Sequence, residues 1–271
     1  EMKMKRSEKL GMLTGLVVGV LLLLISVFMI FQTTCKVWGA EKPANATQQG
    51  IDVSSHQGKI DWEQVKNSAL ADYAIIRCGY GVNQTDKDDK CWDYNSSECE
   101  RLGIPYGTYL YSGADTTAKA KSEAEHVVRL LQGKNLTYPI YYDMEADMLN
   151  QLSSTQIGNI AKTFLNTMES YGYKNVAVYS NKYLFETKLT ASVFSDYPKW
   201  IAQHSNKCTY QGSYHMWQYS TQGVIPGISE KVDLNYKIGN WTYAGYSSPK
   251  KTVVVKPKAT TIKSLKKSGK K

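Results

Sequence analysis

The sequence predicts an α/β fold, an irregular TIM-like barrel with eight strands and fewer than eight helices, preceded by one transmembrane helix. Three observations predict it. Short apolar runs alternate with segments of helical periodicity, which is typical of a parallel sheet covered by helices. Eight such runs occur, and the last three have little helical sequence between them, so we expect an irregular closed barrel. A separate uncharged apolar stretch near the N-terminus indicates a membrane span.

The first 31 residues predict a membrane anchor. Residues 1–9 form a basic segment, and residues 10–31 contain no charge. As a helix this stretch spans roughly 33 Å, enough to cross a hydrocarbon core of about 30 Å. The preceding Lys and Arg residues are expected to keep the N-terminus in the cytoplasm, so the rest of the chain would lie outside, held to the cell membrane by a single pass. A cleaved signal peptide ending at Ala40 is the alternative, and it would make the protein secreted.

A polar linker at 32–49 is expected to connect this segment to the body of the chain at 50–246. In the body, helices are predicted where apolar or small residues recur three or four positions apart, as they do from Trp92 to Gly103. The predicted strands are 50–54, 73–81, 104–112, 138–146, 176–180, 200–205, 215–220 and 232–236. The predicted helices are 60–69, 89–103, 116–132 and 154–171.

The net charge of +9 belongs to the ends of the chain. The segment from Lys250 to Lys271 has nine lysines and no acid, whereas residues 50–249 carry 18 bases and 21 acids. A body of this charge disfavours nucleic acid as a partner. The tail at 247–271 is expected to be disordered. It could bind anionic wall polymers or lipid headgroups, or simply act as a solubilising end, and both interpretations stay open.

The five cysteines show no metal-binding or redox spacing. They stand at positions 35, 78, 91, 99 and 208, and no CxxC pair occurs. Cys78 and Cys99 lie in apolar or helical patterns and are expected in the core. An exported protein can form disulfides, and Cys91 with Cys208 is the pair to test.

The stretch YPIYYDMEAD at 138–147 places two acids in an otherwise apolar run. In a strand, alternate residues share a face, so Asp143 and Glu145 point to one side with Tyr141, and Tyr142 and Met144 point to the other. A solvated strand end would also accept two carboxylates. Whether the pair is a functional site or a solvated strand end depends on whether other acids lie close to Asp143 and Glu145 in the fold.

Two further acids are expected at the same place. Asp52 ends the first predicted strand, and Asp233 lies in the last, each between apolar neighbours. Catalytic groups of parallel barrels gather at the carboxyl ends of the strands, and the first and last strands of a closed barrel are neighbours. Four acids in one concave mouth raise at least one pKa, as a general acid near neutral pH requires. Carboxylates of this kind, with an abundance of tyrosine and tryptophan, favour glycoside hydrolysis.

Eight segments occur in an order that resembles one family. They are GIDVSSHQGKIDWEQVK, YAIIRCGYG, the spacing from Asp89 through Trp92, Asn95 and Cys99 to Gly103, GIPYGTYLYS, YPIYYDMEAD, WIAQHS, MWQYS and VDLN. Together they resemble the glycoside hydrolase family 25 lysozymes, the Chalaropsis-type N-acetylmuramidases, over about residues 50–240. Each motif alone is weakly specific, and their common register is what carries the resemblance.

The resemblance implies a peptidoglycan hydrolase that cleaves the β-1,4 bond between N-acetylmuramic acid and N-acetylglucosamine. It implies Glu145 as the general acid and Asp143 as the residue that orients or polarises the 2-acetamido group of the substrate. Asp52 and Asp233 would maintain the charge and hydrogen bonding of the site. The attacking group can be the acetamido oxygen or water, and no metal or cofactor is required.

Candidate sugar contacts are Tyr80, Tyr111, Trp200, Gln203 and Trp217. His56 and His204 depart from the family pattern, which has an aromatic residue, often Trp, at the first position and Tyr at the second. These departures concern the stacking of sugars and leave the acids unchanged.

Two alternatives remain beside a membrane-anchored muramidase. A non-catalytic cell-wall glycan-binding module on the same barrel would not need the acid pair of Asp143 and Glu145. A chitinase of the family 18 kind would show DxxDxDxE, and this chain has only the last acid pair, preceded by Ile140 and Tyr141.

Overall fold

The computed structural model describes residues 18–20, 40–241 and 256–257. The chain divides into two compact units, residues 1–39 and 40–271. Of the first unit only residues 18–20 are described, and they are helical. The predicted membrane helix at 10–31 therefore lies almost wholly outside the described residues, as does most of the predicted tail at 247–271. Within the described part of the chain, no helix has the length and apolar character that a membrane crossing requires.

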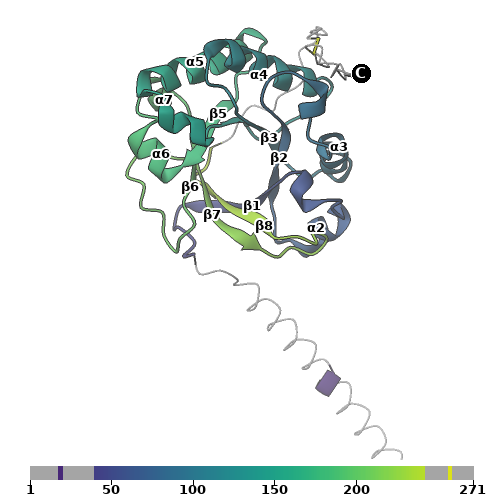
Figure 1. Ribbon diagram of the computed structural model, residues 1–271. Coiled ribbons are helices and arrows are strands. Elements are labelled where there is room, and N and C mark those ends of the chain that lie inside the picture. Colours follow the sequence, from purple (N-terminus) through teal and green to yellow (C-terminus); the bar gives the residue numbers. More distant parts are fainter. Residues whose placement is uncertain (1–17, 21–39, 242–255, 258–271) are drawn as a thin grey trace, which may run out of the picture. The chain divides into compact units, whose positions relative to one another are not determined.

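The second unit is a closed barrel of eight strands arranged in chain order (Figure 1). Each predicted strand is found, and the barrel confirms the predicted fold class for this unit. The strands are β1 (Ala46–Val53), β2 (Tyr73–Tyr80), β3 (Tyr106–Tyr111), β4 (Ile140–Asp143), β5 (Val176–Asn181), β6 (Lys199–Ala202), β7 (Met216–Gly223) and β8 (Val232–Ile238).

Strand β8 makes the barrel irregular. Strands β1 to β7 pair in parallel with their neighbours, whereas β8 runs antiparallel to both β7 and β1. The loop from β7 to β8 covers only residues 224–231, too short for the crossover that a parallel connection needs. This geometry explains why the end of the chain has few helices.

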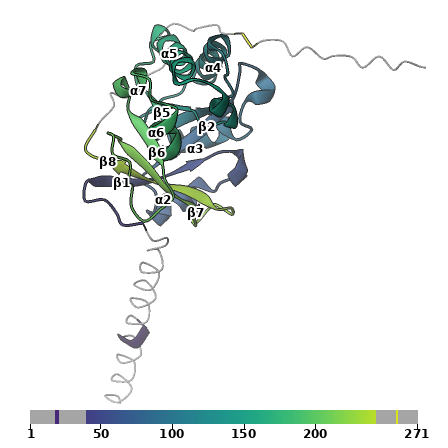
Figure 2. The ribbon, with the colours of Figure 1, turned by 60° about the vertical axis from the view of Figure 1, so that its left-hand side comes forward.

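Helices cover the outside of the parallel part of the barrel (Figure 2). The four predicted helices are present, and α6 and α7 were not predicted because each is shorter than two turns. The helices are α2 (Trp62–Ser68), α3 (Trp92–Leu102), α4 (Thr117–Leu130), α5 (Ser154–Ser170), α6 (Lys182–Thr187) and α7 (Val193–Asp196). Short 3-10 segments occur at Ser55–Gln57, Thr85–Lys87 and Asp147–Gln151.

Side-chain caps fix where these helices begin. The side chains of Asp61 and Thr116 accept hydrogen bonds from backbone N–H groups in the first turns of α2 and α4. Ser153 and Gln156 form a reciprocal capping box at the start of α5. Such caps satisfy donors that have no partner within the helix.

The predicted linker at 32–49 extends too far, because β1 begins at Ala46. Residues 46–49 are paired with the end of β8, in a register that runs from Ala46 opposite Ile238 to Gln49 opposite Tyr236. The sequence ATQQ has no apolar alternation, and this extension of β1 depends on its antiparallel partner.

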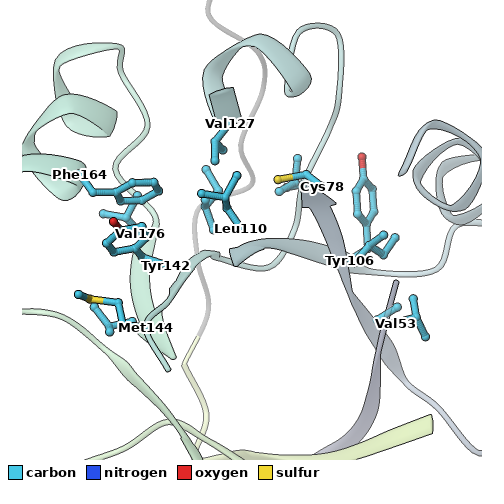
Figure 3. Packing of buried hydrophobic residues seen from close by; sticks show 14 of the residues in the cluster. Val53, Cys78, Tyr106, Leu110, Val127, Tyr142, Met144, Phe164 and Val176 are labelled. Carbon is cyan, nitrogen blue, oxygen red and sulfur yellow. The ribbon is translucent and has the colours of Figure 1, made fainter. Parts of the chain in front are cut away.

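Two apolar layers follow the alternation of the strands. The interior of the barrel is filled by side chains that include Tyr73, Ile75, Tyr141, Trp200 and Met216. Residues of opposite parity pack outward against the helices. Figure 3 shows part of this outer layer, with Val53, Cys78, Tyr106, Leu110, Val127, Tyr142, Met144, Phe164 and Val176 labelled. The predicted division of 138–147 is thus confirmed for Tyr141 on the inside and for Tyr142 and Met144 on the outside.

The four cysteines of the described residues are free thiols. Cys78 and Cys99 are buried, as predicted. Cys91 and Cys208 are not bonded to each other, so the candidate disulfide is wrong for this structure. The Sγ atom of Cys91 instead lies 3.6 Å from the carbonyl oxygen of Gly58. Cys35 lies outside the described residues.

The first prediction concerns Gly50 in β1, which is the ladder partner of Tyr73, the first residue of β2. A Cβ atom at Gly50 would lie 2.4 Å from the ring of Tyr73, which is fully buried and stacked on Tyr138 at 4.4 Å between centroids. Because the ring cannot move aside, Gly50→Ala is expected to lower the free energy of unfolding by about 1–3 kcal/mol. Denaturant unfolding measures this. In the control Gly113→Ala, the new Cβ meets its nearest atom at 3.9 Å, and a change above about 1 kcal/mol there would contradict the steric explanation.

Candidate functional site

All four predicted acids line one small cavity at the mouth of the barrel. This acid pocket has a volume of about 70 Å³, and its lining is Asp52, Tyr109, Asp143, Glu145, Tyr179, Trp200, Gln218 and Asp233. Asp143 is the last residue of β4, and Glu145 follows two positions later. The predicted location at the carboxyl ends of parallel strands is therefore confirmed for Asp52, Asp143 and Glu145.

Asp233 reaches this pocket because β8 is reversed. It is the second residue of β8, and the start of an antiparallel strand lies beside the ends of its parallel neighbours. Asp52 and Asp233 are direct partners in the ladder between β1 and β8. The prediction that these two acids would be close is confirmed.

Two amides orient the carboxyl group of Asp52. Its Oδ2 atom accepts hydrogen bonds from Nε2 of Gln218 at 3.0 Å and from Nδ2 of Asn235 at 2.8 Å. The indole N–H of Trp200 donates to Oδ1 of Asn235 at 2.8 Å, which fixes the direction of that amide. One oxygen of Asp52 is thus occupied by two neutral donors, and the group still faces Asp233.

The amide of Gln218 is itself oriented from the mouth of the barrel. Its Oε1 atom accepts from the hydroxyl of Tyr179 at 3.0 Å and lies 3.0 Å from Nε2 of His204. Since Oε1 can only accept, Nε2 of His204 carries the proton in this arrangement. Gln218 and Asn235 were not predicted, although each stands two positions from an inward-facing residue of its strand, Met216 and Asp233.

Asp52 and Asp233 behave as a proton-sharing pair. Burial raises the pKa of Asp52 well above its usual range, and the charge of Asp233 raises it further, against the two amide hydrogen bonds. Burial also raises the pKa of Asp233 to about 6, while the hydrogen bond from Asp52 opposes the rise. Burial and the mutual repulsion of the two groups therefore favour retention of a proton by the pair as a whole.

Asp143 and Glu145 differ in exposure. Asp143 is 3% exposed, and burial raises its pKa, with the charges of Glu145 and Asp52 adding to the effect and that of Arg77 opposing it. Its Oδ1 atom has no hydrogen-bond partner among the described residues. Glu145 is only partly buried, and its pKa is raised by burial and then by the charge of Asp52, while His204 and the hydroxyl of Tyr179 oppose the rise. Glu145 is thus a carboxyl that keeps its proton to higher pH and that solvent can reach.

Arg77 brings a positive charge to this end of the barrel, and the sequence reasoning missed it. Its Nε atom donates to Oδ2 of Asp89 at 2.8 Å, and an Nη2 hydrogen goes to the hydroxyl of Ser55 at 3.0 Å. Asp89 is almost fully buried and also accepts from the backbone N–H groups of Ser55 and Cys91. The signal in the sequence was a lone arginine within the apolar run YAIIRCGYG.

The predicted sugar contacts divide into three groups. Trp200 lines the acid pocket and packs against Tyr179, with 4.4 Å between ring centroids. Tyr80 and Tyr111 are partners at the ends of β2 and β3, are 40% and 36% exposed, and stand on the rim. Gln203 does not line the pocket, and its side chain bonds to Thr209.

Trp217, like Gln203, lies outside the pocket lining and is a correction to the predicted set. It is fully buried in the outer apolar layer, and its indole N–H donates to the backbone oxygen of Gln203 at 2.8 Å. Its neighbours in β7, Met216 and Gln218, are the residues that face inward, so Trp217 has the wrong parity for a sugar contact. His56 is exposed in the 3-10 helix after β1 and outside the pocket lining, whereas His204 stands at the pocket mouth through its bond to Gln218.

Known proteins match this chain over most of the barrel. A family model described as glycosyl hydrolases family 25 matches residues 51–228. The autolytic lysozyme of Clostridium acetobutylicum is 30% identical over 188 residues, 69% of this chain and 55% of that protein. Lysozyme M1 of Streptomyces globisporus is 28% identical over 201 residues, 69% of this chain and 66% of that protein.

Solved structures of known proteins also resemble this barrel. The modular autolysin LytC from Streptococcus pneumoniae superposes with a TM-score of 0.64 at 33% identity, covering 70% of this chain and 46% of that one. The same autolysin has been solved in complex with a synthetic peptidoglycan ligand. This chain thus spans about half the length of LytC and of the clostridial lysozyme.

The second prediction follows from the pair of Asp52 and Asp233. Because the folded protein holds the proton of Asp233 more tightly than the unfolded chain does, the contribution of this group to stability is complete below a pH of about 4. It is lost as the pH rises through about 6. Asp233→Asn keeps an acceptor oxygen but cannot ionise. Its free energy of unfolding relative to wild type is therefore expected to increase between pH 4 and pH 8 by an amount on the order of 2 kcal/mol.

Denaturant unfolding at a series of pH values measures this difference. The control is Asp93→Asn, since the side chain of Asp93 is 90% exposed and its ion pair with Lys134, at 3.6 Å, is screened by solvent; only a small change of stability is expected of it at any pH. Parallel curves for Asp233→Asn and wild type would show that Asp233 binds no extra proton in the folded state.

Proposed function

The chain belongs to family 25 of the glycosyl hydrolases, and from this premise we propose that it is a peptidoglycan hydrolase of the lysozyme type. The bond cleaved is the β-1,4 linkage from N-acetylmuramic acid to N-acetylglucosamine. The observation that carries this proposal is the acid pocket itself, where four carboxyl groups converge at the barrel mouth between aromatic walls.

Glu145 is the general acid of the proposed reaction. Its raised pKa keeps the carboxyl protonated at higher pH than an ordinary glutamic acid, and its partial exposure lets a glycosidic oxygen approach. Donation of this proton to the leaving oxygen accompanies cleavage of the bond to the anomeric carbon. His204 and the hydroxyl of Tyr179 lie close enough to Glu145 to oppose the rise in its pKa, and so favour the carboxylate that results.

Asp143 assists the 2-acetamido group of the substrate. Asp143 lines the pocket, and its buried Oδ1 atom has no hydrogen-bond donor among the described residues. The acetamido N–H supplies such a donor, and this contact would turn the acetamido oxygen toward the anomeric carbon. Attack by that oxygen displaces the leaving sugar and gives a cyclic intermediate, which water then opens with the Glu145 carboxylate as base; direct attack by water gives the product in one step and passes its proton to a carboxylate of the pocket.

Asp52 and Asp233 supply negative charge beside the reacting sugar. Between them they retain one proton, which limits the repulsion in the pocket while leaving a carboxylate near the developing oxocarbenium-like charge. Tyr109, Tyr179 and the buried Trp200 line the pocket, whereas the exposed rings of Tyr80 and Tyr111 on the rim are the surfaces on which a sugar ring can stack.

The substrate and the location of the enzyme are part of the same proposal. A peptidoglycan ligand bound to LytC, and the lysozyme names of two relatives, support glycan strands of bacterial cell wall as the substrate. Residues 10–31 would hold the barrel at the outer surface of the cell membrane, and the lysine-rich tail would contact anionic wall polymers.

The third prediction tests the general acid. In Glu145→Gln the proton donor is lost, so the rate is expected to fall by about 10²–10⁴. Mass spectrometry of purified peptidoglycan treated with the full chain measures new reducing-end N-acetylmuramic acid. The control Asp147→Asn removes an exposed carboxylate two residues away, and full activity is expected of it.

The outcomes separate the two interpretations of the barrel. Product from wild type and Asp147→Asn, with almost none from Glu145→Gln, would support a muramidase. Binding of peptidoglycan without product from any variant would instead support a non-catalytic wall-binding module. Equal product from all three would mean that Glu145 is not the acid.

The fourth prediction concerns the aromatic rim. Tyr111→Ala removes an exposed ring beside Asp143 and is expected to raise KM about fivefold, equivalent to about 1 kcal/mol of stacking. Tyr94 on α3 is also 36% exposed, and Tyr94→Ala is expected to leave KM unchanged. Steady-state kinetics on soluble glycan fragments compares them, and an equal effect of both changes would contradict a glycan contact at Tyr111.

A further inference from the structure

A buried carboxyl group outside the barrel takes no part in the reaction proposed above. Glu123 lies on the inner face of α4 and is fully buried. Its Oε2 atom accepts hydrogen bonds from the hydroxyls of Tyr142 at 2.6 Å and Ser112 at 2.9 Å, and its Oε1 atom accepts from the backbone N–H of Gly113 at 2.7 Å. Burial raises the pKa of Glu123, and these three donors oppose the rise by stabilising the ionised form.

The partners of Glu123 come from two neighbouring strands. Ser112 and Gly113 directly follow β3, whose last residue is Tyr111, and Tyr142 directly precedes Asp143 in β4. Tyr111 and Asp143 are opposite each other in the ladder. One carboxylate therefore joins the ends of the two strands that carry a rim aromatic and the proposed catalytic acids.

The rest of the acid-bearing segment has little freedom. The backbone N–H of Ser112 donates to the carbonyl oxygen of Asp143 at 2.9 Å, and the N–H of Met144 donates to the carbonyl of Tyr179 at 2.9 Å. The ring of Tyr142 stacks on Phe164 with 3.8 Å between centroids (Figure 3). The hydrogen bond to Glu123 holds the hydroxyl of Tyr142 on the outer side of this segment. Together these contacts prevent β4 from rotating about its own axis.

We propose that Glu123 is a positioning residue, which ties the ends of β3 and β4 together from outside the barrel and so sets the direction in which Asp143 and Glu145 enter the acid pocket. The role rests on the proposed function, because the direction of these acids has a consequence for rate only if they perform the reaction. A displacement of about 1 Å at a catalytic group can cost about 100-fold in rate.

The barrel contains a second tyrosine–glutamate hydrogen bond, to the exposed Glu100, that serves as the control. Tyr106 is also buried, and its hydroxyl donates to Oε1 of Glu100 at 2.6 Å, the same distance as between Tyr142 and Glu123. Tyr106 is the first residue of β3, at the opposite end of that strand from Tyr111. Removal of either hydroxyl costs one tyrosine–glutamate hydrogen bond, but only one of the two bonds adjoins the acids.

The experiment compares Tyr142→Phe with Tyr106→Phe in the full chain. Because Glu123 is fully buried and Glu100 is exposed, Tyr142→Phe is expected to lower the thermal midpoint by about 3 °C and Tyr106→Phe by less. Tyr142→Phe is expected to lower kcat on peptidoglycan fragments about tenfold with KM within about twofold, whereas Tyr106→Phe changes kcat by less than about twofold. Glu123→Gln replaces one acceptor oxygen by an NH2 group, which cannot accept a hydrogen bond from any of the three donors. It is therefore expected to lower kcat at least as much as Tyr142→Phe.

A second readout does not depend on catalysis. The titration midpoints of Asp143 and Glu145, followed by carbon-13 NMR of labelled carboxyl groups, are expected to move by about 0.5 pH units in Tyr142→Phe and to stay in place in Tyr106→Phe. Equal losses of kcat in both variants, or a loss of thermal stability alone in Tyr142→Phe, would overturn the positioning role. If wild type releases no product, the proposed function fails by itself, and the midpoints still decide: movement only in Tyr142→Phe supports the role, and no movement rejects it.

Discussion

The carboxyl groups of Asp52 and Asp233 face each other across the ladder that closes the barrel. The hydrogen bonds of the site and part of the rise in its pKa values follow from this contact. Two buried like charges cannot both ionise cheaply, so the pair retains a proton. The amides of Gln218 and Asn235 donate to Asp52, and Trp200, Tyr179 and His204 in turn orient those amides. The polar residues of the mouth thus form one connected network around a single pair. Burial is the main cause of the raised pKa values of Asp143 and Glu145; the charges of Glu145 and then Asp52 add to the rise at Asp143, and the charge of Asp52 adds to it at Glu145.

The direction of β8 makes that contact possible. In a fully parallel barrel, Asp233 at the start of its strand would lie at the opposite end from Asp52. The short connection from β7 forces β8 to run backward, and the start of β8 then lies at the carboxyl ends of the other strands. The same reversal extends β1 back to Ala46, where polar residues pair with the end of β8. The irregular part of the fold and the location of the acids therefore have a common cause.

The sequence predicted the eight strands and the meeting of the four acids, because apolar alternation and strand ends are local signals. It could not predict which residues of β7 face the interior of the barrel and which face the helices. That strand is buried on both faces, so Trp217 and Met216 look alike by hydrophobicity, and only the closed barrel shows which one faces inward. Arg77, Gln218 and Asn235 were missed for a related reason: a polar side chain inside a barrel is recognisable only once its partner is known. The short helices α6 and α7 lack the length at which periodicity becomes a signal.

The pairing of β1 with β8 also determines when during synthesis the site can exist. The two strands that bring Asp52 and Asp233 together are the first and the last of the barrel, and between them lies almost all of the folded domain. A chain still being made holds Asp52, Asp143 and Glu145 long before Asp233 has been added. Contacts of such long sequence separation form late in folding. The nascent chain thus lacks one of the four acids of the pocket until its final strand is available, so the proposed site is completed only when synthesis of the barrel ends.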